Sequence, residues 1–310
     1  MKHQISCLRG LRVVDLLMFL WLAAKPLWGQ DMPLTQILLD GEDWREVSQG
    51  HRFTEAPATN RQGEVFFVDV PASRLWKIRT DGQVELFAEN TGKASGLMFD
   101  NQGRLFACQS ETQRVVWYDT EGKSHLVAEG IAGNDLAVDR WGGVYVTDMK
   151  GRRLWYVNAT GESRVVAEGF TPNGVILWPD GGTLVVADWD EPYLWAWRIE
   201  KTGDLRFGAP YYRPVPMPPR QEKPGSDGLT VDDAGRVYLC CHAGLAVFDP
   251  TGRLSGVIAK PQNQFLSNVT FGGSAYDTLY VTCTDKVYAR KTSTRGTPHA
   301  WWNADRSLSK

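Results

Sequence analysis

A repeat of about forty residues constrains the fold more than any other feature of this sequence. In five copies a polar or charged residue stands eight positions before a turn glycine, as in GNDLAVDRWGG (133–143) and SDGLTVDDAG (226–235). A hydrophobic stretch follows each turn, and a sixth copy with a looser turn begins at NVTFGG. We call the leading residues of the copies the pivot residues. They are Glu55, Ser95, Asn134, Asn173, Asp227 and Asn268, spaced by 40, 39, 39, 54 and 41 positions.

The content of each unit predicts the architecture. Short stretches rich in β-branched and aromatic residues, such as VYVTD (144–148) and RLWYV (153–157), alternate with Gly-rich turns. A unit of this length with about four short strands is typical of a propeller blade. A two-sheet sandwich predicts no fixed period, and no unit has apolar residues at helical spacing. We therefore predict an all-β, six-bladed β-propeller with a central metal site and a blade core of about residues 52–291.

The start of the chain belongs to another class. A basic segment, MKHQISCLRGLR, precedes the short apolar run VVDLLMFLWLAA. This order predicts a signal peptide over residues 1–30 and a single domain over 31–310 that is exported, either periplasmic or secreted. The alternative is an uncleaved N-terminal anchor, although the run is short for a membrane span. The segment LLDGEDWREVSQ (38–49) precedes the first copy and is expected to supply the missing outer strand of the last blade.

Composition excludes some classes of function. The formal charge of −2 gives no electrostatic footprint for nucleic acid or an anionic membrane. No stable membrane span and no protein partner are inferred. Four cysteines follow the predicted signal peptide at the ends of hydrophobic stretches, without metal-binding spacing, and are expected to be buried free thiols. They are Cys108, Cys240, Cys241 and Cys283.

The pivot residues are predicted to share one location, because the innermost strands of a propeller begin at the same mouth of its channel. They offer two carboxylates, three amides and one hydroxyl, but no His or Cys. Two carboxylates at short range repel each other unless a cation lies between them. Oxygen ligands suit one divalent ion, with Ca²⁺ favoured and Mg²⁺ or Mn²⁺ as alternatives. The competing interpretation is that these residues only cap turns, although Glu55 is not a turn former.

At these positions the sequence resembles the gluconolactonase, senescence-marker-protein (regucalcin) and luciferin-regenerating-enzyme family. The resemblance covers about residues 52–290 and is carried by TEAPATNRQGEVFFVDVPASRLWKI, NDLAVDRWGGVYVTD, PNGVILWPDGGTLVVADWD, SDGLTVDDAGRVYLCC and NVTFGGSAYDTLYVTC. It implies a six-bladed propeller with one divalent metal, often calcium, in the central channel. It also implies Glu55, Asn173 and Asp227 as metal ligands, and Asn134 as a contact to substrate or to a metal-bound water.

Two further pivot residues, Ser95 and Asn268, occupy equivalent strand starts and are predicted to bind substrate. One departure concerns Ala132, which stands where some family members carry a substrate-binding arginine. The metal site is unaffected, but the substrate preference of those members does not transfer.

The predicted function is metal-assisted hydrolysis of a small-molecule sugar lactone, as in a gluconolactonase, by attack of water on the lactone carbonyl. Asp227 is the candidate catalytic base, and the alternative is that it serves as a ligand only. Two other functions stay open: a non-catalytic sugar- or calcium-binding propeller, and an aryl-ester or organophosphate hydrolase using the same metal site. The Pro-rich insertion 208–225 is expected to border the channel mouth, or else to be a surface loop. His242 is expected to lie away from the pivot residues.

Overall fold

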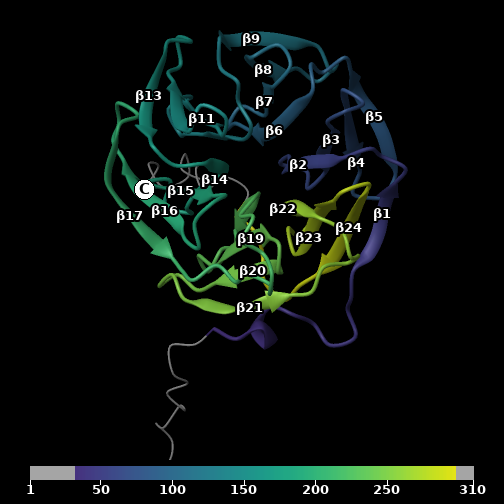
Figure 1. The fold of residues 1–310 in the computed structure, drawn as a ribbon. Helices are drawn as coiled ribbons and strands as arrows, with labels where there is room; N and C mark the ends of the chain where they lie inside the picture. The colour runs from purple at the N-terminus through teal and green to yellow at the C-terminus, as the bar shows by residue number, and fades with distance from the viewer. Residues whose placement is uncertain (1–31, 298–310) are drawn as a thin grey trace, which may run out of the picture. The chain divides into compact units, whose positions relative to one another are not determined.

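The computed structural model describes residues 32–297, which form six four-stranded antiparallel sheets around a common centre (Figure 1). The prediction of an all-β, six-bladed β-propeller is confirmed. The predicted signal peptide, residues 1–30, lies outside the described residues, as does the chain after residue 297. The domain limits of 31–310 therefore stay a prediction. No helix within 32–297 has the length and apolar character needed to span a bilayer.

Every blade contains an innermost, a second, a third and an outermost strand, each paired with the next. The innermost strands of blades 1 to 6 are β2 (Thr54–Thr59), β6 (Ala94–Phe99), β10 (Leu136–Val138), β14 (Pro172–Leu177), β18 (Leu229–Val231) and β22 (Leu266–Gly272). The second strands are β3 (Val65–Asp69), β7 (Leu105–Gln109), β11 (Val144–Asp148), β15 (Thr183–Asp188), β19 (Val237–Cys241) and β23 (Thr278–Cys283). The third strands are β4 (Arg74–Ile78), β8 (Arg114–Tyr118), β12 (Arg153–Val157), β16 (Leu194–Ile199), β20 (Gly244–Phe248) and β24 (Lys286–Lys291). The outermost strands are β5 (Val84–Glu89), β9 (Ser124–Glu129), β13 (Ser163–Glu168), β17 (Leu205–Tyr212), β21 (Leu254–Ile258) and β1 (Arg45–Gln49).

The innermost strands close a ring. Each one contacts the innermost strand of the next blade, and β22 of blade 6 contacts β2 of blade 1. In Figure 1 the labels β2, β6, β14 and β22 surround the centre, while β5, β9, β13, β17 and β21 lie at the periphery. The six pivot residues, which lead the innermost strands, are therefore brought together by the closure of the ring.

The sixth blade is completed by the start of the chain. Strand β1 pairs antiparallel with β24, with Arg45 opposite Ala289 and Gln49 opposite Lys286. The expectation that residues 38–49 supply this outer strand is confirmed for β1, which follows a short 3₁₀ turn, η1 (Leu34–Gln36). The two ends of the propeller thus share one sheet.

The turn after the innermost strand explains why most copies of the repeat keep an Asp or Asn and a Gly. In blade 3 the carboxylate of Asp139 accepts hydrogen bonds from the backbone amides of Trp141 and Gly143, both at 2.8 Å. Gly142 between them has a φ of 83°, which a residue with a Cβ adopts only with strain. The same side-chain-to-backbone turn forms at Asn60, Asp100 and Asp232.

The core lies within and between the blades. All five residues of β3, β7, β11, β19 and β20 are buried, because both faces of these strands pack against apolar side chains. The four predicted thiols are free and buried, as expected. Outermost strands such as β5 contain only partly buried and exposed residues, and they face solvent.

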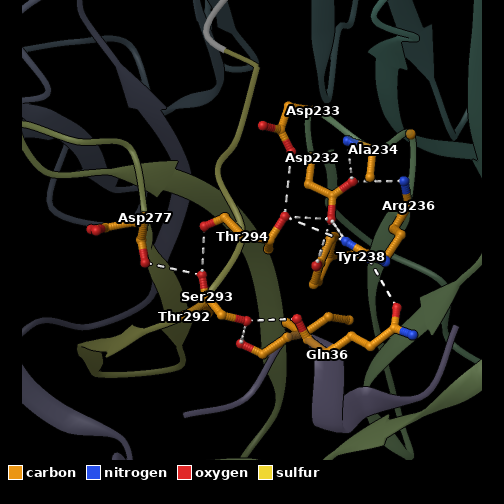
Figure 2. A network of polar contacts seen from close by, with 12 residues as sticks. Gln36, Asp232, Asp233, Ala234, Arg236, Tyr238, Asp277, Thr292, Ser293 and Thr294 are labelled. Carbon is orange, nitrogen blue, oxygen red and sulfur yellow. Dashed lines mark hydrogen bonds and ion pairs between the residues drawn. The ribbon is translucent and has the colours of Figure 1, made fainter. Parts of the chain in front are cut away.

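A buried polar network, the latch, ties the segments next to the chain ends to blade 5 (Figure 2). Asp232, whose side chain is fully buried, forms an ion pair of 2.7 Å with Arg236. Thr294, just after β24, donates to the Asp232 carboxylate at 3.0 Å, and Gln36 of η1 accepts from Arg236 at 3.4 Å. Asp232 follows β18 directly, so the latch lies at the end of that strand away from its pivot residue, Asp227.

Candidate functional site

All six pivot residues stand at the starts of the innermost strands. Four of them are within the first three residues of β2, β6, β14 and β22, and two precede β10 and β18 by two residues. Asn173, Asp227 and Asn268 are buried, whereas Glu55, Ser95 and Asn134 remain partly exposed. The predicted clustering at one end of the innermost strands is supported by the contacts described next.

One set of contacts joins blades 3, 4 and 5. The side-chain amide of Asn134 donates to Oδ1 of Asn173 at 2.5 Å. Asn173 in turn hydrogen-bonds to the carboxylate of Asp227. The two asparagines therefore connect one of the predicted carboxylate ligands to the neighbouring blades.

A second set joins blades 6 and 1. Nδ2 of Asn268 donates to Oε2 of Glu55 at 3.2 Å, and the backbone amide of Ala56 donates to the same oxygen at 2.8 Å. The hydroxyl of Ser95 points elsewhere, because it donates to the backbone carbonyl of Asn134 at 2.8 Å. The Ser95 side chain thus ties blade 2 to blade 3, and Asn268 holds the Glu55 carboxylate.

A third carboxylate, Asp135, joins the site and was missed in the sequence. It is buried, accepts from the backbone amide of Leu136 at 2.8 Å, and is hydrogen-bonded to Asn268. Successive side chains of a strand point to opposite faces, so the pattern of pivot residues did not single out the position after them. A signal was nonetheless present, since the other five copies carry only small or apolar residues there: Ala56, Gly96, Gly174, Gly228 and Val269.

The glycines at that position allow neighbouring blades to approach. A Cβ on Gly228 would lie 1.9 Å from Cγ of Asn268, and one on Gly96 would lie 2.6 Å from Cα of Asp135. Real Cβ atoms do not approach other heavy atoms this closely. Neighbouring blades can therefore bring the pivot side chains together only because Gly96 and Gly228 have no side chain.

The electrostatics reflect carboxylates withdrawn from water at short range. Burial raises the pKa of Glu55 to about 8, and the charge of Asp135 adds to this effect. Burial raises the pKa of Asp135 to about 7. The pKa of Asp227 is raised well above its ordinary range by burial, and then by the charges of Glu55 and Asp135. Ionisation of Glu55 therefore opposes ionisation of Asp227.

The donor set at the site consists of carboxylate and amide oxygens from Glu55, Asn173 and Asp227, with Asn134 beside them. Hard divalent cations prefer such oxygens, and a bound cation would relieve the opposition between the carboxylates. Within residues 32–297, no three side chains of the His, Cys, Asp or Glu type are grouped so as to hold a metal by themselves. A cation here would therefore depend on amide oxygens as well as on the two acids.

A cavity of about 110 Å³ continues between the innermost strands beyond the pivot residues. Asp135 and Asn268 border it, and so do Gly296 and Thr297 after β24. The backbone amide of Thr297 donates to the carbonyl of Val231, the last residue of β18, at 3.4 Å. Chain therefore lies across the far end of the cavity, and the partly exposed side of the site is the mouth where the innermost strands begin.

His242 lies nearer to the pivot residues than the sequence predicted. Its ring packs against Gly225, two residues before Asp227, and its backbone amide donates to the carbonyl of Pro224 at 2.9 Å. The end of the insertion 208–225 therefore borders the site, as expected. The two tyrosines within it do not: Tyr211 donates to the carbonyl of Pro250, and Tyr212 packs on Phe248.

The matching segments have a counterpart among known families. A family model described as the SMP-30/gluconolactonase/LRE-like region matches residues 53–285, which is most of the chain and contains all six pivot residues. The chain belongs to this family. The resemblance noted in the sequence is therefore confirmed, and the carboxylates and amides described above are the polar centre of an SMP-30/gluconolactonase/LRE-like propeller.

Solved structures agree with this assignment. A gluconolactonase from Xanthomonas campestris superposes with a TM-score of 0.72 at 24% identity, covering 84% of this chain and 92% of that one. A calcium-binding regucalcin from Agrobacterium tumefaciens gives 0.71 at 16% identity, covering 84% and 97%. A luciferin-regenerating enzyme gives 0.70 at 15% identity, covering 84% and 99%. No curated protein sequence matches the chain. At these identities the likeness shows the fold, and the reaction is decided by the site.

Proposed function

We propose that this SMP-30/gluconolactonase/LRE-like protein hydrolyses a cyclic ester, in the manner of a sugar lactonase, and depends on one divalent cation. One observation carries the proposal: two mutually opposed carboxylates, Glu55 and Asp227, share a partly exposed site with the amide of Asn173. Acids held this close are costly to ionise unless a cation lies between them. The family and the name of the calcium-binding neighbour support Ca²⁺ as that cation, with Mg²⁺ or Mn²⁺ as alternatives.

Glu55, Asn173 and Asp227 would hold the cation. When bound, it would supply Lewis-acid polarisation of the carbonyl that is attacked. The surrounding residues fix these donors: Asn268 holds the carboxylate of Glu55, and Asn134 holds the amide of Asn173. The site thus has its oxygens oriented by neighbouring blades, which reduces the reorganisation needed when substrate binds.

We assign proton transfer to Asp227. Its carboxylate is buried at the site and hydrogen-bonded to Asn173, so it is held in place to accept a proton. A water positioned between Asp227 and a lactone carbonyl would pass its proton to this carboxylate as it attacks. The bond between the carbonyl carbon and the ring oxygen then breaks, and Asp227 returns the proton to that oxygen, which leaves as the alcohol of the opened hydroxy acid, so no further reactant is required. Asn134, partly exposed at the mouth, would orient the substrate.

The test is lactone hydrolysis followed by pH-stat titration, with glucono-δ-lactone, other aldonolactones and aryl esters as substrates. We expect activity with Ca²⁺, loss of activity with a chelator, and recovery when Ca²⁺ is restored. Asp227→Asn should lower kcat by about 100-fold or more, whereas the exposed control Glu121→Gln should leave it unchanged. Full activity after chelation, or in Asp227→Asn, would overturn the proposed mechanism. Calcium binding without turnover of any ester would favour a binding protein.

We also propose, from the N-terminal sequence alone, that the protein is exported. Mass spectrometry of protein recovered from cells should find a mature N-terminus near residue 30. An intact Met1 on all of the recovered protein would contradict export by signal cleavage.

A further inference from the structure

Three aromatic rings meet beside the carboxylates. Trp189 follows β15, His242 follows β19 and Phe265 precedes β22, so each ring comes from a different blade. The ring centroids of Trp189 and His242 are 5.7 Å apart, those of Trp189 and Phe265 are 5.9 Å apart, and those of His242 and Phe265 are 5.6 Å apart. We call these three side chains the aromatic wall.

The aromatic wall is attached to the segments that lead into the pivot residues. The backbone amide of Trp189 donates to the carbonyl of Thr171, two residues before Asn173, at 2.9 Å. The ring of His242 lies on Gly225, two residues before Asp227, where a Cβ would be 2.4 Å from Nε2. Phe265 is three residues before Asn268. The wall therefore borders the mouth of the site on the side of blades 4, 5 and 6.

Ion pairs hold this side of the mouth in place. Asp190, next to Trp189, accepts from Nζ of Lys223 at 2.6 Å and from the hydroxyl of Thr171 at 2.7 Å. Arg152 also donates to Thr171, at 2.7 Å. These contacts join the insertion to blade 4. Arg152, Asp190 and Lys223, the charged groups beside Trp189, are thus engaged with one another.

The aromatic wall is an apolar surface made of three rings whose planes are inclined to one another. All three residues are half-buried, so part of each remains exposed. Burial, followed by the charge of Lys260, lowers the pKa of His242, so its imidazole is neutral at neutral pH. The ring planes cross at 74°, 52° and 66°, so the three rings together form an uneven apolar surface and not one flat face. A flexible hydrocarbon can follow such a surface.

We propose that the substrate is a cyclic ester carrying an alkyl substituent, with its ester group at the carboxylates and its alkyl chain against Trp189, His242 and Phe265. This inference rests on the proposed function and narrows its substrate class. It assigns the aromatic wall to substrate selection, and it predicts that alkylated lactones are better substrates than polyhydroxylated aldonolactones.

The experiment compares kcat/KM for γ-butyrolactone, γ-decalactone and glucono-δ-lactone with calcium-loaded protein. Each methylene laid against the rings can contribute up to about fourfold. We expect γ-decalactone to exceed γ-butyrolactone by tenfold or more, mainly through KM. Trp189→Ala and Phe265→Ala should each remove most of that preference and leave γ-butyrolactone within about twofold. The control Trp141→Ala, an exposed tryptophan in a turn of blade 3, should change nothing.

The outcomes separate the possible roles of the wall. Equal losses for all three lactones would show a structural role and overturn the proposal, as would a wild-type preference for glucono-δ-lactone. His242→Phe should retain the chain-length preference, because the imidazole acts as packing surface. If Trp189→Ala fails to fold, Phe265→Ala and His242→Asn provide the same comparison.

The proposal can also be tested if the proposed function fails. If no lactone is hydrolysed, ligand-observed NMR can measure the binding of γ-decalactone and γ-butyrolactone to the same proteins. Tighter binding of γ-decalactone that is lost in Phe265→Ala would support the wall without catalysis. Equal binding of both lactones would overturn it.

Discussion

Glu55→Gln tests the central physical claim about this site, that a carboxylate largely withdrawn from water and set beside other acids is destabilising until a cation binds. In protein treated with a chelator, the pKa of Glu55 is raised from its ordinary 4.5 to about 8 by burial first and by Asp135 second. Between these two pH values the folded state retains a proton that the unfolded state releases. Folding is therefore most favoured below pH 4.5, and stability is lost as the pH rises towards 8.

The size of the effect follows from the two pKa values. Their difference corresponds to at most roughly 5 kcal/mol of unfolding free energy for Glu55 alone. For a domain of this size, that is a decrease in Tm of the order of 10 °C between pH 5 and pH 8.5. The neutral Gln side chain carries no such penalty. Metal-free Glu55→Gln should match wild type near pH 5 and exceed its stability by a few kcal/mol at pH 8.5.

The assay is thermal unfolding in EGTA across this pH range, repeated with excess Ca²⁺. Calcium should raise the Tm of wild type most at high pH, where its ligands ionise, and should raise that of Glu55→Gln much less. Glu121→Gln, on an exposed turn, is the matched control and should follow wild type. A Glu55→Gln protein whose Tm falls with pH as steeply as that of wild type would refute the reasoning.

Three further outcomes are expected. Gly228→Ala should lower the unfolding free energy by about 1–3 kcal/mol in urea and weaken calcium binding, because the new Cβ would overlap Asn268. An unchanged midpoint of the urea unfolding curve would contradict this explanation. Asp232→Ala should lower the unfolding free energy by about 3–5 kcal/mol, since it leaves Arg236 buried and unpaired, whereas Asp233→Ala at the exposed neighbouring position should cost little. A thiol reagent should modify Cys108, Cys240, Cys241 and Cys283 only after unfolding; rapid labelling of the native protein at any of the four would contradict their burial.

Much of this fold was predictable because its information is local. The Asp and Gly of each turn, such as Asp139 and Gly142, act within a few residues of one another, and the apolar stretches mark strands directly. The period then fixed the number of blades and the alignment of the pivot residues. Even the closure of blade 6 by β1 followed from counting strands.

The details of the site depended on contacts between blades, which a periodic pattern does not specify. Asp135 contributes because it meets Asn268 of blade 6 across the ring. Ser95 instead bonds the backbone of blade 3, although it occupies the same position in its repeat as Glu55. His242 was misplaced for a similar reason, since its contact with Gly225 depends on the path of the insertion.

The closure of blade 6 by β1 also governs when the site can exist. Glu55 and Asn268 are 213 positions apart, yet their side chains touch only after the last blade docks on the first. During synthesis, the first five blades can emerge and pack in order, while the group of carboxylate and amide oxygens at the pivot residues stays incomplete. We therefore expect affinity for the proposed cation to appear in a single step when blade 6 closes on blade 1, so that binding of this cation would report on whether a newly made chain has finished folding.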